Sequence, residues 1–317
     1  MIDVINTIVY AGRLKNEIDL MSSSSGGAFT ALSDYFLKSG DAIISAIYNY
    51  ENHTTEFQMI LNKEQREKAK GSKYMQSKAG NIYRHACQWL YENPEKKLLF
   101  IGMGCQADGF RKFSEKKAIR DRVYIVDIIC HGTPSPKLWR EYVSSIQNKG
   151  KLTYLTFKDK RNGWQSPYAF VIINGIEKPI KDYVNIFYNQ CALRPSCYEC
   201  PYATTERKID MTIGDFWHIE DTIPDFYSPN GNSVFLIHTN RGQALFEKIK
   251  VDLDYRISNT RECWQENLEF PTKKSKKRNI FWKDYQKGGI GYVMKKYGKK
   301  TLKNRIKNKI FKVLKGI

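Results

Sequence analysis

The chain has 317 residues, of which 41% are hydrophobic and 13% aromatic, a composition that can fill a substantial core and excludes wholesale disorder. No apolar run approaches the roughly 18–20 residues of a membrane span, and the first residues lack the pattern of a secretory signal, so we expect a cytoplasmic protein. The net charge is +19, but residues 271–317 hold 17 Lys and Arg and a single acidic residue. The basic character therefore belongs to a tail, and the main body is nearly balanced.

Strand and helix patterns alternate along the first 130 residues. Phe29, Leu32 and Phe36 have helical spacing, with serines and glycines before them and Gly40 after them. Further along, the pattern predicts strands over 41–50, 98–101 and 123–130 and helices over 62–70 and 83–93. This alternation is typical of a parallel sheet, so we expect an α/β fold with a mainly parallel or mixed sheet and flanking helices.

The second half of the chain departs from this alternation. Residues 151–190 predict a β-rich insertion, which is followed by an aromatic helix. Residues 232–249 then predict a strand and a helix, with Thr239 or Asn240 as the N-cap.

Four of the seven cysteines form a candidate metal site. Cys197 and Cys200 make a C-x-x-C pair in a loop, which can bind one metal through both sulfurs. Cys105 comes after one predicted strand and Cys130 ends another. Parallel strands place such positions at one edge of the sheet, so these two cysteines complete the set. Four thiolates suit a structural zinc or an iron–sulfur cluster equally, and a redox dithiol is the alternative for the C-x-x-C pair. The remaining cysteines are expected to pack in the core or to be bystanders: Cys87, Cys191 and Cys263.

Two glycine-bearing turns are candidates for holding the pyrophosphate of a nucleotide cofactor. The first precedes a helix, where free N–H groups and the helix dipole favour an anion, although serines there are also ordinary caps. The second adds a lysine and hydroxyl groups. Neither turn has the G-x-G-x-x-G or P-loop pattern. The residues of the two turns are Ser24, Ser25, Gly26 and Gly27, and Gly71, Ser72, Lys73 and Tyr74.

In combination, the motifs of this chain resemble those of the coenzyme F420 hydrogenase/dehydrogenase beta subunits, especially the bacterial branch associated with polysaccharide biosynthesis. They cover residues 20–250 in the family's order and read SSSSGGAFTAL, GSKYMQS, GMGCQADGF, VDIICHGTPSP, FKDKRNGW, LRPSCYECPYA and DMTIGDFW. The resemblance implies FAD beside a [4Fe–4S] cluster, and it favours iron over zinc. It implies that Cys105, Cys130, Cys197 and Cys200 are the cluster ligands. It also places the flavin against two segments, Ser24–Gly27 and the residues from Gly71 to Ser77.

The chain departs from the family pattern in two respects. Where the family reads Thr-Pro-Cys-Gln, this sequence has Met103, Gly104, Cys105 and Gln106, so a hydroxyl that contacts flavin or substrate is lost. The N-terminal ferredoxin-like domain of many relatives is also expected to be missing. Electrons would therefore come from a separate ferredoxin-like donor or partner subunit.

Two further residues have more than one interpretation. His131 is the candidate catalytic acid or base, because its ordinary pKa lies near neutrality. A hydrogen bond from His131 to the cluster or the backbone is the alternative, and the sequence favours it. Asp215 in the TIGDFW motif either forms a turn or contacts a cofactor, and the turn is favoured.

The basic tail is a second unit. We expect a main domain over 1–260 and a helical tail over 261–317. Residues 301–317 place apolar side chains on one helical face and Lys and Arg on the other, the pattern of a helix at an anionic membrane surface, with a solvated helix that caps the body as the alternative. A peripheral position at the inner face of the membrane would follow from the first interpretation. Nucleic acid is disfavoured as a partner, because no recognised nucleic-acid module is present.

These observations lead to two functional hypotheses. The first is an FAD- and [4Fe–4S]-dependent oxidoreductase that passes electrons between a ferredoxin-like donor and an organic substrate, either of the F420 type or a sugar intermediate. The alternative is a non-catalytic polysaccharide-biosynthesis factor with a structural zinc or cluster.

Overall fold

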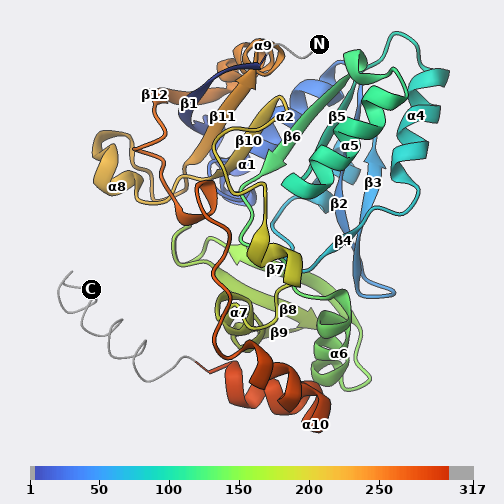
Figure 1. Cartoon of the computed structure of the whole chain (residues 1–317), viewed down its shortest axis with the longest axis vertical. Coiled ribbons are helices and arrows are strands. Elements are labelled where there is room, and N and C mark those ends of the chain that lie inside the picture. The colour runs from blue at the N-terminus through green and yellow to red at the C-terminus, as the bar shows by residue number, and fades with distance from the viewer. Residues whose placement is uncertain (1–3, 300–317) are drawn as a thin grey trace.

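The computed structural model describes residues 4–299, which form a large and a small body (Figure 1). A nine-stranded mixed sheet with helices on both faces builds the large body, and a three-stranded antiparallel sheet with helices builds the small one. The predicted α/β class is therefore confirmed.

Nine strands make up the large sheet. They are β1 (Val4–Leu14), β2 (Ala42–Asn49), β3 (Thr54–Ile60), β4 (Ser77–Lys78), β5 (Leu98–Met103), β6 (Val123–Ile128), β10 (Met211–Asp215), β11 (Ser233–Thr239) and β12 (Leu253–Ser258). Their order is β12-β1-β11-β10-β6-β5-β2-β3-β4. The four central strands β10, β6, β5 and β2 are parallel, while β11, β1 and β12 on one side and β3 on the other pair antiparallel with their inner neighbours.

Ten α-helical segments lie within the described residues. They are α1 (Glu17–Ser22), α2 (Ala28–Lys38), α3 (Lys63–Ala69), α4 (Ile82–Glu92), α5 (Gly104–Lys116), α6 (Pro136–Gln147), α7 (Lys181–Tyr188), α8 (Ile219–Thr222), α9 (Asn240–Ile249) and α10 (Arg278–Tyr297). Within residues 4–299, none of them has the length and apolar character that a membrane-crossing helix needs.

The central strands are buried on both faces because helices cover each side. Successive side chains of a strand point to opposite faces. Ile43 belongs to the same buried cluster as Phe36 of α2, and its neighbour Ile44 belongs to the cluster that contains Phe110 of α5. The continuous apolar runs of β2, β5 and β6 therefore reflect a sheet packed between two helical layers.

The small body has a core of its own, rich in aromatic side chains. The predicted insertion contains β7 (Leu152–Asp159), β8 (Tyr168–Ile173), β9 (Ile176–Pro179) and α7. Trp139 of α6 packs edge-on against Tyr183 of α7, with ring centroids 4.7 Å apart. Phe281 and Val293 of α10 belong to the same cluster. The first helix of the basic tail thus packs on the insertion, whereas the amphipathic segment predicted over 301–317 lies outside the described residues.

A buried ion pair links two central strands to the start of α9. Thr239 is the N-cap of α9, as predicted, and its hydroxyl accepts the Gly242 N–H at 3.0 Å. The same hydroxyl donates to the Asp210 carboxylate at 3.0 Å. Asp210 also accepts from the guanidinium of Arg120 at 2.9 Å and from the N–H of Ile125 at 2.8 Å. One buried carboxylate therefore satisfies three donors.

We expect Asp210→Ala to lower the free energy of unfolding by about 3–5 kcal/mol, because it leaves the buried Arg120 guanidinium without its counter-charge. The matched control is Glu64→Ala, which removes an exposed pair with Lys68 and should change stability little. Urea unfolding followed by circular dichroism measures both. Equal effects of the two substitutions would contradict this account of the pair.

Candidate functional site

A cavity of about 380 Å³ lies where the two bodies meet. Met103, Ile128 and Asp215, at the carboxyl ends of β5, β6 and β10, line it from the large body. Lys158 of β7 and Tyr188 of α7 line it from the small body. Parallel sheets bring ligands to this edge, because the loops after their strands converge there.

Most of the residues predicted to bind a cofactor line this cavity. They are Ser24, Ser25, Gly71, Ser72, Lys73, Tyr74 and Ser77. Gly26 and Gly27 are not among the lining residues. A Cβ on Gly26 would lie 2.3 Å from the carbonyl oxygen of Gly12, and Gly27 adopts a φ of +84° with its Cβ position 2.3 Å from Leu14 Cδ1. These two glycines allow the serine turn, residues 22–27, to pack closely against β1.

Asp215 connects the serine turn to the small body across the cavity. Its carboxylate accepts hydrogen bonds from the Ser25 hydroxyl and from the Lys158 ammonium. Lys158 also lies over the ring of Trp217, 5.7 Å from the centroid. Asp215 therefore ends strand β10, and its carboxylate also forms hydrogen bonds with other residues that line the cavity. Sequence reasoning missed Lys158, because only the tertiary fold brings this residue of β7 to Asp215.

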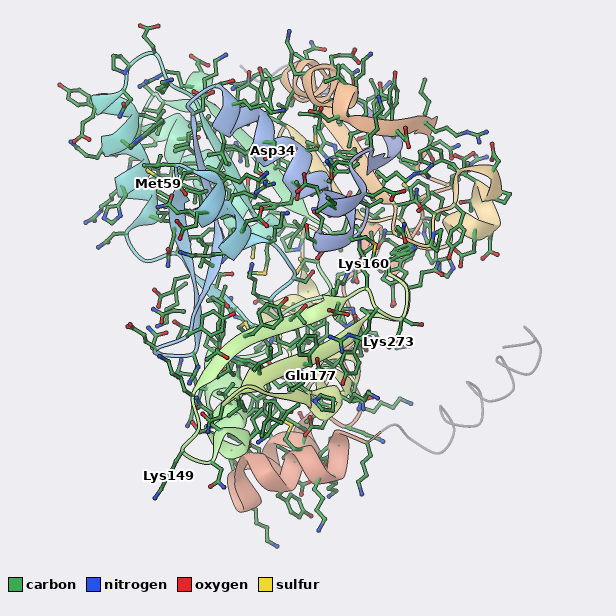
Figure 2. The ribbon with its side chains drawn as sticks, turned by 180° about the vertical axis from the view of Figure 1, so that it is seen from behind. Asp34, Met59, Lys149, Lys160, Glu177 and Lys273 are labelled. Carbon is green, nitrogen blue, oxygen red and sulfur yellow. The ribbon has the colours of Figure 1, made fainter. Side chains whose placement is uncertain are left out.

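A second lysine fixes the serine turn from beneath. Lys160 donates to the carbonyl oxygens of Leu20 and Ser25, both at 2.6 Å, and to that of Asn230 at 2.7 Å. Burial lowers the pKa of Lys160 to about 7, while the nearby charge of Asp215 favours the protonated form. Figure 2 labels Lys160 where the small sheet meets the large body. This side chain holds the loop after β7 against the turn that was predicted to bind cofactor.

Lys73, the cation of the second glycine turn, has a local partner. Its ammonium donates to the carbonyl oxygens of Ala69 and Lys70 at 2.5 and 3.0 Å, at the end of α3. Burial lowers the pKa of Lys73 to about 7. Gly71, two residues earlier, has a φ of +81° and open space at its Cβ position. The turn therefore offers the cavity a glycine backbone, while its lysine caps a helix.

Three residues that line the cavity carry buried polar atoms without a hydrogen-bond partner in the described part of the chain. These atoms are Ser24 Oγ, Gln106 Oε1 and His131 Nε2. Buried polar atoms in native proteins nearly always have partners. Burial also lowers the pKa of His131, so its imidazole is neutral near pH 7. The three atoms are candidate contacts for a bound ligand.

The loops of the predicted cluster ligands pack tightly together. Cys130 lines the cavity, and its sulfur accepts the N–H of Gly132 at 3.3 Å. Gly132 has a φ of +115°, and a Cβ there would lie 3.1 Å from Cys197 Cβ and 3.5 Å from Cys197 Sγ. A glycine is needed here because this φ is strained for any other residue and because the side chains of Leu193 and Cys197 occupy the space.

The four predicted ligands lie within electrostatic reach of one another. Burial raises the pKa of Cys130 to about 12, with smaller contributions from the charges of Cys197, Cys105 and Cys200, while the hydrogen bond from Gly132 opposes this rise. Burial likewise raises the pKa of Cys105, again with contributions from Cys200 and Cys197. Within residues 4–299, however, no group of three or more His, Cys, Asp or Glu side chains has metal-binding geometry. The assignment of these cysteines as ligands therefore stays a prediction.

The departure at Met103 and Gly104 has a packing counterpart. Met103 lines the cavity at the position where the family carries threonine. A Cβ on Gly104 would lie 2.9 Å from Tyr202 Cβ and 3.0 Å from Asp127 Oδ2. Because Tyr202 and Asp127 fill this space, the turn before Cys105 has no room for a side chain at Gly104.

These features define an α/β protein with a cavity at the carboxyl edge of its central parallel strands and a group of thiols beside that cavity. The family model for the C terminus of the coenzyme F420 hydrogenase/dehydrogenase beta subunit matches residues 95–262. The chain therefore belongs to this family of oxidoreductase subunits, and the resemblance found in its motifs is confirmed.

A solved structure supports the same fold. It is the xenon-derivatised F420-reducing [NiFe] hydrogenase complex from Methanosarcina barkeri, one chain of which is similar with a TM-score of 0.55 and 17% sequence identity. The similarity covers 93% of this chain and 92% of that chain. The comparison with curated proteins gave no match.

We expect Gly26→Ala to destabilise the protein by about 3 kcal/mol or more, because its new methyl group would meet two backbone atoms that cannot move aside. These atoms are the carbonyl oxygen of Gly12 and the N of Ser233, at 2.3 and 2.6 Å. Gly71→Ala is the control. It meets no atom within 4 Å and should cost only the roughly 1–2 kcal/mol of a left-handed backbone. Urea unfolding compares the two variants, and a larger loss for Gly71→Ala would contradict the packing role of Gly26.

Proposed function

We propose that this chain is an iron–sulfur flavoprotein that passes electrons between a ferredoxin-like donor and an organic substrate. Its family supports an oxidoreductase role, and the proposal adds FAD and one [4Fe–4S] cluster. One observation carries it: Cys130 and His131 line the same cavity as Ser24, Ser25 and the 71–77 segment. The predicted flavin site and the predicted cluster site would thus share a wall.

The cavity lining fits a flavin nucleotide. Ser24 Oγ and Gln106 Oε1 are buried and unpartnered within residues 4–299, so they are available to hydrogen-bond a bound cofactor. The volume of about 380 Å³ falls in the range of ligand pockets. A bound flavin would supply hydride chemistry, since it can take up two electrons together and release them singly.

The donor chemistry of the cysteine loops supports a cationic inorganic centre. The four thiols come from three separate segments, and burial together with the charges of Cys197 and Cys200 raises the pKa of both Cys105 and Cys130. A bound cation would reverse this penalty, because it stabilises the deprotonated sulfurs. The Gly132 N–H already donates to Cys130 Sγ, and hydrogen bonds to sulfur tune the potentials of iron–sulfur clusters.

The polar groups of the cavity support an organic substrate with hydrogen-bonding groups. Lys158 and Asp215 present an ammonium and a carboxylate at the cavity wall, and Trp217 adds a flat apolar surface beside them. The family name supports a substrate of the F420 type, and a sugar intermediate is the other class we propose. The solved relative is one chain of a hydrogenase complex, which supports a separate partner protein as the electron donor.

Anaerobic purification followed by FAD, iron and sulfide quantification tests the proposal. We expect a yellow-brown protein with about four irons per chain and a broad absorbance near 400 nm. Cys105→Ser and Cys197→Ser should each lower the iron content to less than about one per chain, because a cluster ligand is lost. Cys87→Ser, in α4, is the matched control and should keep the full content.

Two results would contradict the proposal. Full iron content in both ligand variants would exclude these cysteines as ligands. A colourless protein with stoichiometric zinc and no flavin would instead support a non-catalytic factor with a structural metal.

A further inference from the structure

A basic segment, residues 273–278, passes the loops that carry the predicted cluster ligands, and none of its residues lines the cavity. Residues 273–278 read KKSKKR, five cations in six residues, and no acidic residue occurs between Phe270 and Asp284. In Figure 1 the chain that leads into α10 runs from the large body down to the small one. We call residues 273–278 the basic segment.

The basic segment is held at both ends by the loops that carry the predicted ligands. Just before it, the Thr272 hydroxyl donates to the carbonyl oxygen of His131 at 2.5 Å, next to Cys130. At its end, Arg278 donates to the carbonyl oxygens of Cys191 and Leu193 at 3.0 and 2.6 Å. Arg278 also donates to the hydroxyl of Tyr198, which lies between Cys197 and Cys200 in the sequence, at 3.0 Å.

Ser275 adds a contact in the middle of the segment, where its hydroxyl lies 3.4 Å from Cys191 Sγ. The basic segment is therefore an ordered strip fixed along the cysteine loops. Its anchors use Thr272, Ser275 and Arg278, which leaves the lysine side chains free for another purpose.

Four lysines of the strip project their charges into solvent. Lys273, Lys274, Lys276 and Lys277 are all exposed. Among the ion pairs found within residues 4–299, none involves them. Figure 2 labels Lys273 beside the small sheet, on the side where Lys160 marks the junction of the bodies.

Exposed groups of the cysteine loops extend this positive surface. Arg194 is exposed and directly follows Leu193, whose carbonyl oxygen accepts from Arg278, and the side chain of Cys105 is exposed as well. The predicted cluster site thus reaches the surface beside a row of solvent-exposed cations. This arrangement suits a redox partner with a negatively charged surface. Donor and acceptor must approach closely for electron transfer, and opposite charges speed their encounter.

We propose that the basic segment and Arg194 form the docking surface for a small acidic electron-transfer protein of the ferredoxin type. This inference rests on the proposed function and names the face through which electrons would enter. An anionic membrane or a nucleic acid would also be attracted by lysines. The anchoring of the strip on the cysteine loops favours a redox partner, because only that partner would use this proximity.

The test uses the full chain, purified anaerobically, and an acidic 2[4Fe–4S] ferredoxin as the probe. The docking variant carries Lys273→Glu, Lys274→Glu, Lys276→Glu and Lys277→Glu. The control carries Lys283→Glu, Lys287→Glu, Lys295→Glu and Lys299→Glu, which change the net charge equally on exposed positions of α10 and just after it. Calorimetric titration at low salt gives the dissociation constants, and circular dichroism verifies folding.

We expect the docking variant to raise the dissociation constant at least about tenfold and the control to raise it less than about threefold, because close charges dominate the attraction. The difference should shrink in 0.5 M salt. Similar weakening in both variants, or no binding of the ferredoxin by the unmodified chain, would overturn the docking surface. The docking surface would also be overturned if the docking variant lost binding to vesicles with 30% phosphatidylserine, or to single-stranded DNA, but kept its affinity for ferredoxin.

The same preparations separate this inference from the proposed function. Iron, sulfide and FAD are quantified in each sample before titration. If the cofactors are present but the docking and control variants weaken ferredoxin binding equally, the docking surface alone is refuted. Localised ferredoxin binding by a protein that holds neither iron nor flavin would support the surface and refute the proposed function.

Discussion

The parallel alignment of the central strands is the constraint on which the rest of the structure depends. Because β5, β6 and β10 run in the same direction, Met103, Cys130 and Asp215 reach the same edge of the sheet although they are far apart in the chain. The cavity and the thiol group both arise at this edge. If any of these strands ran in the reverse direction, the loop that follows it would lie at the opposite edge of the sheet, away from the cavity.

The small body completes what the sheet edge begins. Lys158 reaches Asp215, and Lys160 holds the serine turn through three carbonyl oxygens. Tyr74 of the second glycine turn stacks on Phe187 of α7, with ring centroids 4.3 Å apart and nearly parallel planes. The insertion is thus a wall of the cavity, and its core, shared with α10, gives that wall its rigidity.

Sequence reasoning succeeded where the signal is local. The apolar runs before Cys105 and Cys130 identified β5 and β6, and the capping position of Thr239 followed from the residue types around it. It failed for β1, because residues 4–14 have weak periodicity and lie between two antiparallel neighbours in the sheet. Lys158 and Trp217 escaped detection for a different reason, since their positions in the cavity depend on contacts between distant segments.

The central claim is that four cysteines from three segments hold one iron–sulfur centre beside a flavin cavity. Diffraction from anaerobically grown crystals, recorded on both sides of the iron absorption edge, tests it most directly. The account predicts one anomalous peak within bonding distance of Cys105, Cys130, Cys197 and Cys200, with flavin density in the adjoining cavity. A peak only at the zinc edge, or iron bound elsewhere on the chain, would contradict it.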